Sequence, residues 1–267
     1  MSGLKNKWAL ITGASSGFGE ACAKALAADG ANLVLWARRF DRLERMKSEL
    51  ESAHGVHVRI GRVDVRDRAG VLAAAAALES DGLVPDILVN NAGLASGLDR
   101  LHEGNFEDWD RMIDTNVKGL LNVTRAVLPA MVKRNSGHVV NIGSVAGYVV
   151  YPKGNVYNAT KFAVRALNEA MNIDLLGTAI RVSSIDPGAA ETEFSRVRFH
   201  GDEKRAEAVY DGYQPLRAED IADIVLYVVN TPAHVNITDV VVLPTAQRNP
   251  YLVHKERSGE RKSEREK

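Results

Sequence analysis

Short apolar segments alternate with longer amphipathic segments along most of the chain. Strands are expected where the apolar segments fall, at residues 7–12, 32–36, 56–60, 86–89, 138–142, 180–185 and 239–243. Helices are expected between them, at residues 17–29, 40–53, 67–80, 106–134, 156–176, 203–211 and 218–230. Strands separated by helices are typical of a parallel sheet with helices on both faces. The pattern therefore predicts an α/β fold, a doubly wound parallel sheet in one domain over residues 1–254.

The last stretch, residues 255–267, breaks this pattern. It consists almost entirely of charged residues, serine and glycine. Because such a segment lacks the apolar surface that would offset the entropy lost on ordering, we expect a disordered tail.

Composition narrows the class of protein. The 267 residues are 45% hydrophobic and 25% charged, and Lys+Arg and Asp+Glu number 34 each. This balance gives no electrostatic reason to expect nucleic acid or an anionic membrane as a partner. We find no signal peptide and no apolar run near the roughly 20 residues that span a bilayer, so we expect a cytoplasmic protein. The single cysteine, Cys22, excludes disulfides within the chain and is expected to pack against the sheet.

A glycine-rich turn follows the first expected strand and precedes the first helix. Glycines there allow a tight turn and close approach of the backbone, and the amides and positive end of the helix dipole attract a pyrophosphate. The spacing is G-x-x-x-G-x-G and differs from G-x-G-x-x-G, so an ordinary strand-to-helix turn is the alternative. If a dinucleotide binds, we expect contacts from Gly13, Ser15, Ser16, Gly17, Phe18 and Gly19.

The end of the second expected strand indicates which dinucleotide would bind. A site for NAD usually has an acidic residue there for the ribose hydroxyls. This chain has Arg38 and Arg39 instead, and guanidinium groups bind a 2′-phosphate through charge-assisted hydrogen bonds. We therefore predict NADP(H) as the cofactor. The alternative is that both arginines lie on a solvated face.

Two further strand ends carry small or polar residues that would lie along the same edge of the sheet. Asp64 and Val65 follow the third strand, and Asp64 is suited to accept a hydrogen bond from the adenine amino group. The fourth strand ends in Asn91, Ala92 and Gly93, which would let the backbone approach the ribose. Each segment by itself is also an ordinary turn signal.

Candidate catalytic residues lie downstream. Tyr157 and Lys161 are four residues apart on an expected helix, so they share a face, and the ammonium is expected to lower the pKa of the phenol. Ser144, at the end of a strand, is expected to hydrogen-bond the substrate oxygen. Asn116 is suited to hold a water or a backbone distortion that links Lys161 to solvent. A Tyr-x-x-x-Lys pair alone is common on helices, and the serine and the upstream turn give this pair its meaning.

In this ordered set of motifs, the chain resembles the short-chain dehydrogenase/reductase family over about residues 5 to 245. The resemblance implies a Rossmann-type sheet, a homodimer or homotetramer, and Asn116, Ser144, Tyr157 and Lys161 as a catalytic tetrad. It further implies that Tyr157 and Lys161 contact the nicotinamide ribose and that the segment from Pro187 covers the nicotinamide. The cofactor contacts it adds are Pro187, Gly188 and Thr192.

A narrower resemblance points to a substrate class. The segments 90–97, 154–157, 192–202 and 232–237 are similar to NADP-dependent 3-hydroxy acid dehydrogenases, which act on small acids such as serine, allo-threonine or malonic semialdehyde. Arg196 and Arg198 fall in the segment expected to close over the site, and either is suited to bind a substrate carboxylate. The alternative is that both are surface residues or make subunit contacts.

Other functions remain open at this level. One is reduction of a different small carbonyl compound, such as a sulfonated aldehyde, a sugar or a diketone. Another is a cofactor-binding module without catalysis, because a fold does not dictate a function. The complete tetrad favours an enzyme. The expected partners are a small substrate and further copies of the chain, which would pack through the helices at 106–134 and 156–176.

Overall fold

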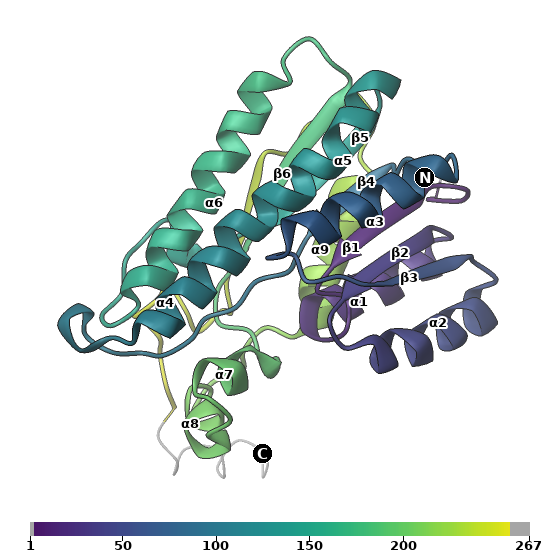
Figure 1. The fold of residues 1–267 in the computed structure, drawn as a ribbon. Helices are drawn as coiled ribbons and strands as arrows, with labels where there is room; N and C mark the ends of the chain where they lie inside the picture. Colours follow the sequence, from purple (N-terminus) through teal and green to yellow (C-terminus); the bar gives the residue numbers. More distant parts are fainter. Residues whose placement is uncertain (1–2, 257–267) are drawn as a thin grey trace.

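A seven-stranded, fully parallel sheet forms the centre of the molecule (Figure 1). The computed structural model describes residues 3–256. The strands lie in the order β3-β2-β1-β4-β5-β6-β7, so the order reverses between β1 and β4. Their bounds are Trp8–Thr12 (β1), Asn32–Ala37 (β2), Val58–Arg62 (β3), Ile87–Asn90 (β4), Gly137–Ile142 (β5), Ile180–Pro187 (β6) and Asp239–Val242 (β7). The predicted doubly wound sheet is confirmed, and ligands bind at such a reversal in open α/β sheets.

Helices cover both faces of this sheet. They are α1 (Gly17–Ala28), α2 (Phe40–His54), α3 (Arg68–Ser80), α4 (Phe106–Ile113), α5 (Leu120–Arg134), α6 (Asn155–Asp174), α7 (Glu193–Arg198), α8 (Glu203–Ala208) and α9 (Ala218–Val229). Alternate residues of each inner strand enter two separate cores. In β1, Ile11 packs in the core beneath α1, α2 and α9, whereas Leu10 packs in the core beneath α3 and α5. Burial of both strand faces explains why these strands are continuous apolar runs.

Two helical predictions differ from the structure. The expected helix at 106–134 is divided, because a π-helical turn, η2 (Asp114–Gly119), separates α4 from α5. The helix α7 was not predicted, since six residues with two arginines show no apolar period. Its start is fixed instead by the Thr192 side chain, which accepts a hydrogen bond from the backbone N–H of Phe194 at 3.2 Å. Among smaller differences, β3 begins two residues later than expected and α8 ends at Ala208.

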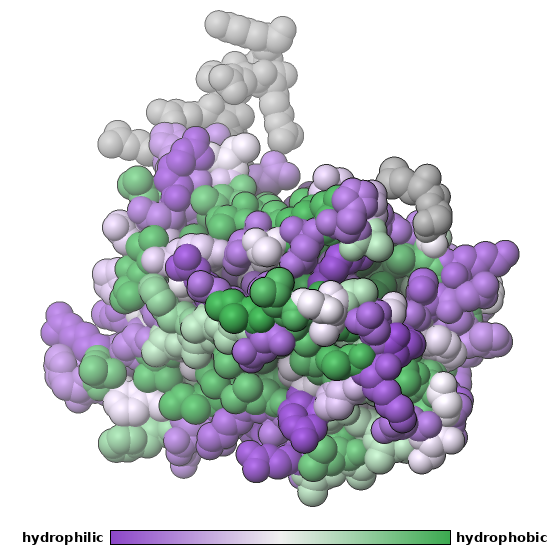
Figure 2. Space-filling model, turned by 90° about the horizontal axis from the view of Figure 1, so that it is seen from above, coloured by the Kyte–Doolittle hydropathy of each residue, from purple (hydrophilic) through white to green (hydrophobic). Residues whose placement is uncertain are grey.

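The carboxyl-terminal part of the described chain folds back on the domain. The backbone N–H of Glu256 donates to the carbonyl of Gly212 at 2.8 Å, and Lys255 lies against Val209. These two residues of the predicted tail are therefore in contact with the body, and residues 257–267 lie outside the described part. Figure 2 shows hydrophobic and hydrophilic residues interspersed over one face of the molecule.

Two further expectations from the sequence concern Cys22 and membrane-spanning helices. Cys22 is fully buried in the core beneath α1, and burial raises the pKa of its thiol to about 12, which fits a packing residue. Within residues 3–256, no helix is both long and apolar enough to cross a membrane.

Replacing Leu88 tests the core between β4 and the helices α3 and α5. Leu88 is completely buried, so Leu88→Ala is expected to lower the free energy of unfolding by about 2–5 kcal/mol. Leu176→Ala is the matched control, because that side chain is 88% exposed and its loss should cost less than about 0.5 kcal/mol. Urea unfolding measures both. Equal losses in the two variants would contradict the packing of Leu88 in this core.

Candidate active site

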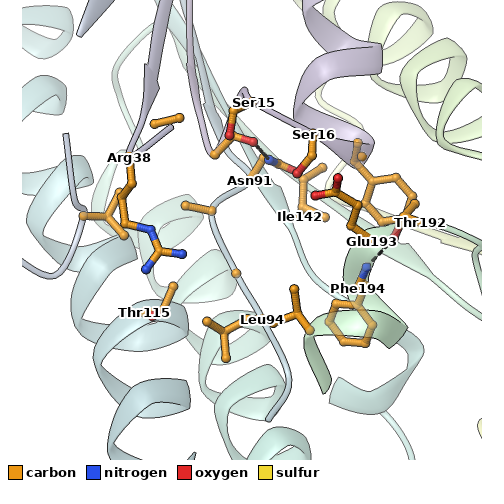
Figure 3. A pocket seen from close by; sticks show the side chains of 18 of the residues that line it. Ser15, Ser16, Arg38, Asn91, Leu94, Thr115, Ile142, Thr192, Glu193 and Phe194 are labelled. Carbon is orange, nitrogen blue, oxygen red and sulfur yellow. Dashed lines mark hydrogen bonds between the residues drawn. The ribbon is translucent and has the colours of Figure 1, made fainter. Parts of the chain in front are cut away.

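A pocket of about 290 Å³ lies at the carboxyl edge of the sheet, where the strand order reverses (Figure 3). Its walls come from the ends of β1, β2, β3, β4 and β5 and from α6 and α7. The predicted site residues that line it are Gly13, Ser15, Ser16, Gly17, Phe18, Arg38, Arg39, Asp64, Val65, Asn91, Ala92, Gly93, Tyr157, Lys161 and Thr192. The structure thus brings the predicted cofactor residues from separate strand ends into one cavity.

The glycine turn is held open by the end of β4. Gly13 and Gly17 have φ of +64° and +55°, a conformation that favours glycine. The Asn91 side chain donates from Nδ2 to the carbonyl of Thr12 at 2.8 Å, and Thr12 Oγ1 accepts the backbone N–H of Asn91 at 3.1 Å. Gly19 does not line the pocket: a Cβ there would come within 2.5 Å of Asn91 Nδ2, so this glycine permits the packing.

The two arginines after β2 differ in their contacts. Arg38 extends into the pocket from the side opposite Glu193 (Figure 3), and within residues 3–256 no hydrogen bond or ion pair engages its guanidinium. Arg39 donates to Ser15 Oγ at 3.1 Å, to Ser16 Oγ at 2.5 Å and to Glu193 at 2.7 Å. The pocket therefore holds guanidinium groups where a phosphate would find charge-assisted donors.

Asp64 is already engaged by a neighbour. Arg66 donates to both of its carboxylate oxygens, and these hydrogen bonds lower the pKa of Asp64 despite partial burial. The carboxylate still lines the pocket, and its remaining lone pairs can accept a further hydrogen bond.

Asn116 lies in the π-helical turn η2 and is 2% exposed. Its Oδ1 accepts the backbone N–H of Leu94 at 2.8 Å, and its Nδ2 donates to the carbonyl of Leu94 at 2.8 Å and to Thr160 Oγ1 at 3.0 Å. The side chain thus ties the segment after β4 to the helix that carries the tyrosine and the lysine. The expected backbone distortion at this residue is present, and Asn116 lies behind the pocket wall.

Tyr157 is buried, and its surroundings differ from the expectation. Burial and the neighbouring Tyr151 raise the pKa of its phenol, while a hydrogen bond from Ser144 and the charge of Arg198 oppose the rise. The prediction that Lys161 lowers the pKa of the Tyr157 phenol is wrong for the protein by itself, because the ammonium is directed at the backbone carbonyl of Ile142. A protonated phenol in this place is suited to donate a proton.

Lys161 directs its ammonium at the backbone. Nζ donates to the carbonyl of Ile142 at 2.9 Å and lies 5.9 Å from the centre of the Tyr157 ring. Burial lowers the pKa of Lys161 to about 8, and the negative charge of Asp186 opposes the drop. A base with a pKa in this range exchanges its proton near neutral pH.

Ser144 is fixed from three sides. Its backbone N–H donates to Asp186 Oδ1 at 3.0 Å, its Oγ accepts the backbone N–H of Ala146 at 3.1 Å, and its Oγ donates to the carbonyl of Pro187 at 3.3 Å. Asp186 is 1% exposed and was not predicted. A Cβ at Gly143 would collide with its carboxylate. An acidic residue that directly precedes Pro-Gly at the end of an apolar strand was the available signal.

Pro187 and Gly188 hold the position of the chain without lining the pocket. The backbone N–H of Gly188 donates to the carbonyl of Val242 at 2.7 Å, and a Cβ at Gly188 would collide with the Gln247 side chain. The segment that leads to α7 therefore leaves the sheet in a fixed direction.

The two arginines predicted to bind substrate have different surroundings. Arg198 lies 5.6 Å from the centre of the Tyr157 ring and donates to Tyr151 Oη at 2.6 Å, and Tyr157 and Arg198 together line a small second pocket. Arg196 instead pairs with Glu203 at 3.3 Å, and both of those side chains are exposed. The structure brings Arg198 to Tyr157 and does not bring Arg196 there.

Comparison with known proteins identifies the family. A family model described as short chain dehydrogenase matches residues 7–203. The chain belongs to this family. The NADP-dependent 3-hydroxy acid dehydrogenase of Salmonella typhi is 47% identical over 89% of this chain and 95% of that relative. The sulfoacetaldehyde reductase of Chromohalobacter salexigens is 46% identical over 89% of this chain and 93% of that relative.

A solved structure of a serine dehydrogenase matches the fold closely. The closed form of serine dehydrogenase complexed with NADP+ superposes with a TM-score of 0.87 and is 45% identical, covering 93% of this chain and 100% of that one. The single-domain Rossmann-type sheet predicted from the sequence is therefore that of a short-chain dehydrogenase.

Several pocket residues of this short-chain dehydrogenase were missed by the sequence analysis. They share no motif, because each reaches the pocket from a strand end or helix that only the fold places there. They are Ala37, Val63, Arg66, Leu94, Arg111, Thr115, Ile142, Gly143, Glu193, Phe194 and Val197.

Replacing Lys161 tests the cost of burying its ammonium. Because the folded pKa lies near 8 and the unfolded pKa near 10.5, the penalty is fully present below pH 8 and fades as the pH rises to about 10.5. Lys161→Met is therefore expected to raise the free energy of unfolding at pH 7 by about 1–2 kcal/mol, after the lost hydrogen bond to Ile142 is counted.

Denaturant unfolding at pH 7 and at pH 10 measures this difference. The gain should be smaller at pH 10. A variant that is less stable than the parent at pH 7 would show that burial of the ammonium is not costly.

Proposed function

We propose that the chain is an NADP(H)-dependent oxidoreductase that interconverts a small 3-hydroxy acid, of the serine, allo-threonine or 3-hydroxypropionate type, with its semialdehyde or keto form. As a short-chain dehydrogenase it acts on CH–OH groups. The observation that carries the substrate class is the Arg198 guanidinium, which lies beside Tyr157 in the pocket that both residues line.

The residues present fit the cofactor. The opened glycine turn would take the pyrophosphate, Arg38 and Arg39 the 2′-phosphate, and Asp64 the adenine. Asn91, Ala92 and Gly93 would lie along the ribose, and Thr192 and the segment after Gly188 would lie over the nicotinamide end. When bound, NADP(H) supplies or accepts the hydride. The serine dehydrogenase of similar structure binds NADP+, and the 3-hydroxy acid dehydrogenase of Salmonella typhi is NADP-dependent.

Residues of the chain would hold and transfer the proton of the reaction. In the reductive direction Tyr157, held protonated by burial, donates its phenolic proton to the substrate oxygen. Ser144 Oγ hydrogen-bonds the same oxygen and stabilises the charge that develops on it. Lys161 and Asn116 support Tyr157 and Ser144. The lysine carries a proton that exchanges near neutral pH, and the asparagine fixes the segment after β4 against α6.

Arg198 would bind the substrate carboxylate. Its guanidinium is held by Tyr151 Oη and by the carbonyl of Gly97, so little side-chain entropy is lost on binding. A sulfonate is also an anion that such a guanidinium binds, and the similarity to a sulfoacetaldehyde reductase makes a sulfonated aldehyde the second candidate. A sugar or diketone would leave Arg198 without an anionic partner, and a regulatory module would have no use for the tetrad.

We also propose that the chain is a cytoplasmic protein that self-associates, as a homotetramer or homodimer. Exposed apolar side chains lie on the helices expected to form the interface: Leu121 and Val132 on α5, and Phe162 and Ile173 on α6. These helices lie side by side on one face of the sheet (Figure 1).

Initial rates of NADP⁺ reduction test the proposed reaction. We expect turnover of L-serine, L-allo-threonine or 3-hydroxypropionate, little turnover of ethanolamine or ethanol, which lack the carboxylate, and little activity with NAD⁺. Tyr157→Phe is expected to lose most of this turnover while NADPH binding is kept. Turnover of 2-hydroxyethanesulfonate alone would select the sulfonated substrate, and equal turnover of the uncharged alcohols would exclude an acidic substrate.

Paired arginine variants test how the carboxylate is recognised. Arg198→Met is expected to raise KM for the acid substrates about 10- to 100-fold, because a charge-assisted hydrogen bond to a carboxylate is lost. Arg196→Met should change KM less than about twofold, since its guanidinium pairs with Glu203 at the surface. Steady-state kinetics on the purified variants measures both. A larger effect at Arg196 would reverse the assignment.

A further inference from the structure

Glu193, the first residue of α7, places a carboxylate on the arginines at the cofactor pocket. Its Oε2 accepts from Arg39 Nη1 at 2.7 Å and its Oε1 accepts from Arg42 Nη1 at 2.8 Å. Figure 3 shows Glu193 beside Ser16 and Thr192, on the wall opposite Arg38. Glu193 therefore brings a negative charge from α7 to the phosphate-binding side of the pocket.

This arrangement engages each of the three nitrogens of the Arg39 guanidinium, and with them three of its five N–H donors. Nε donates a hydrogen bond to Ser15 Oγ, Nη2 donates to Ser16 Oγ, and Nη1 donates to Glu193 Oε2. Arg42 is engaged as well, with Nη1 also directed at the carbonyl of Ser15 at 3.4 Å. A phosphate monoester needs several such donors for its oxygens. A 2′-phosphate that approaches Arg39 from the side of Nη1 must therefore replace the Glu193 carboxylate or lie next to its negative charge.

The carboxylate is the partner that is most readily replaced. Although partial burial opposes it, hydrogen bonds from Arg39 and Arg42 lower the pKa of Glu193 to about 2, so Glu193 is an anion at any working pH. The Glu193 side chain is 37% exposed and the two guanidiniums 42% and 36%. Ion pairs with this exposure are weak, and a phosphate that carries nearly two negative charges competes well for the N–H donors of Arg39 and Arg42.

We infer that Glu193 is a cofactor-specificity residue that competes with the 2′-phosphate: its carboxylate occupies Arg39 and Arg42 until the phosphate of NADP(H) replaces it. The inference rests on the proposed binding of the 2′-phosphate at Arg38 and Arg39. Glu193 then weakens NADP(H) binding selectively and speeds its release, and it leaves NAD(H), which has no 2′-phosphate to exchange for the carboxylate, nearly unaffected.

Titration of the purified full-length protein with NADPH and with NADH, followed by nicotinamide fluorescence at constant ionic strength, tests the inference. Glu193→Gln keeps the size of the side chain and removes its charge. We expect Kd for NADPH to fall about 3- to 10-fold and Kd for NADH to change less than about twofold. Glu193→Ala should act in the same direction. Glu203→Gln is the matched control, because Glu203 pairs with Arg196 outside the pocket, and it should leave both Kd values unchanged.

A second arm separates this inference from the proposed site. Replacing Arg38 and Arg39 by alanine should weaken NADPH much more than NADH, and the gain from Glu193→Gln should disappear in Arg39→Ala. An unchanged or raised Kd for NADPH in Glu193→Gln, or an equal gain for NADH, would overturn the competition while the phosphate site stands. Equal weakening of NADPH and NADH in the double arginine variant would overturn the phosphate site and the inference with it.

Discussion

The hydrogen bonds between Thr12 and Asn91 join the two halves of the sheet where the strand order reverses. Thr12 ends β1 and Asn91 directly follows β4, and each side chain satisfies backbone groups of the other strand end. This clamp fixes the distance between the glycine turn and the segment that runs to Gly93 and Leu94. Since Asn116 in turn binds the backbone of Leu94 and the Thr160 side chain, the clamp extends to α6, which carries Tyr157 and Lys161. The glycine turn and the candidate catalytic residues of α6 are therefore joined by one continuous set of hydrogen bonds.

Around the ends of β5 and β6 the molecule buries several ionisable groups together. Lys161, Asp186 and Tyr157 are each less than one-tenth exposed, and their pKa values are shifted mainly by burial. Burial raises the pKa of Asp186 to about 6 and lowers that of Lys161 to about 8, so both groups change charge near neutral pH. Such a cluster costs stability, and its place beside the pocket is typical of groups tuned for proton transfer.

The short helix α7 connects the two ends of the site. Glu193 at its start reaches the arginines on the phosphate side, and Arg198 at its end reaches Tyr157 and Tyr151. The backbone N–H of Gly97 also donates to the carbonyl of Arg198 at 3.0 Å. One element of six residues thereby contacts the regions assigned to both ligands, so movement of α7 would couple cofactor exchange to the substrate pocket.

The sequence by itself determined the sheet and the glycine turn, because these depend on apolar periodicity and on local spacing. The predicted strands lie within about two residues of the observed ones, and the order of Ser144, Tyr157 and Lys161 in the chain is what makes them candidate catalytic residues. Only the tertiary structure decided which charged groups meet. Glu193 lies over 150 residues from Arg39 and Arg42, so no local pattern joins them. Arg196 and Arg198 look equivalent in sequence, but they lie on different sides of α7. Arg196 pairs with Glu203, and Arg198 lies over the ring of Tyr157. Burial likewise raises the pKa of Tyr157, and the spacing of residues along a helix does not predict how deeply a side chain is buried.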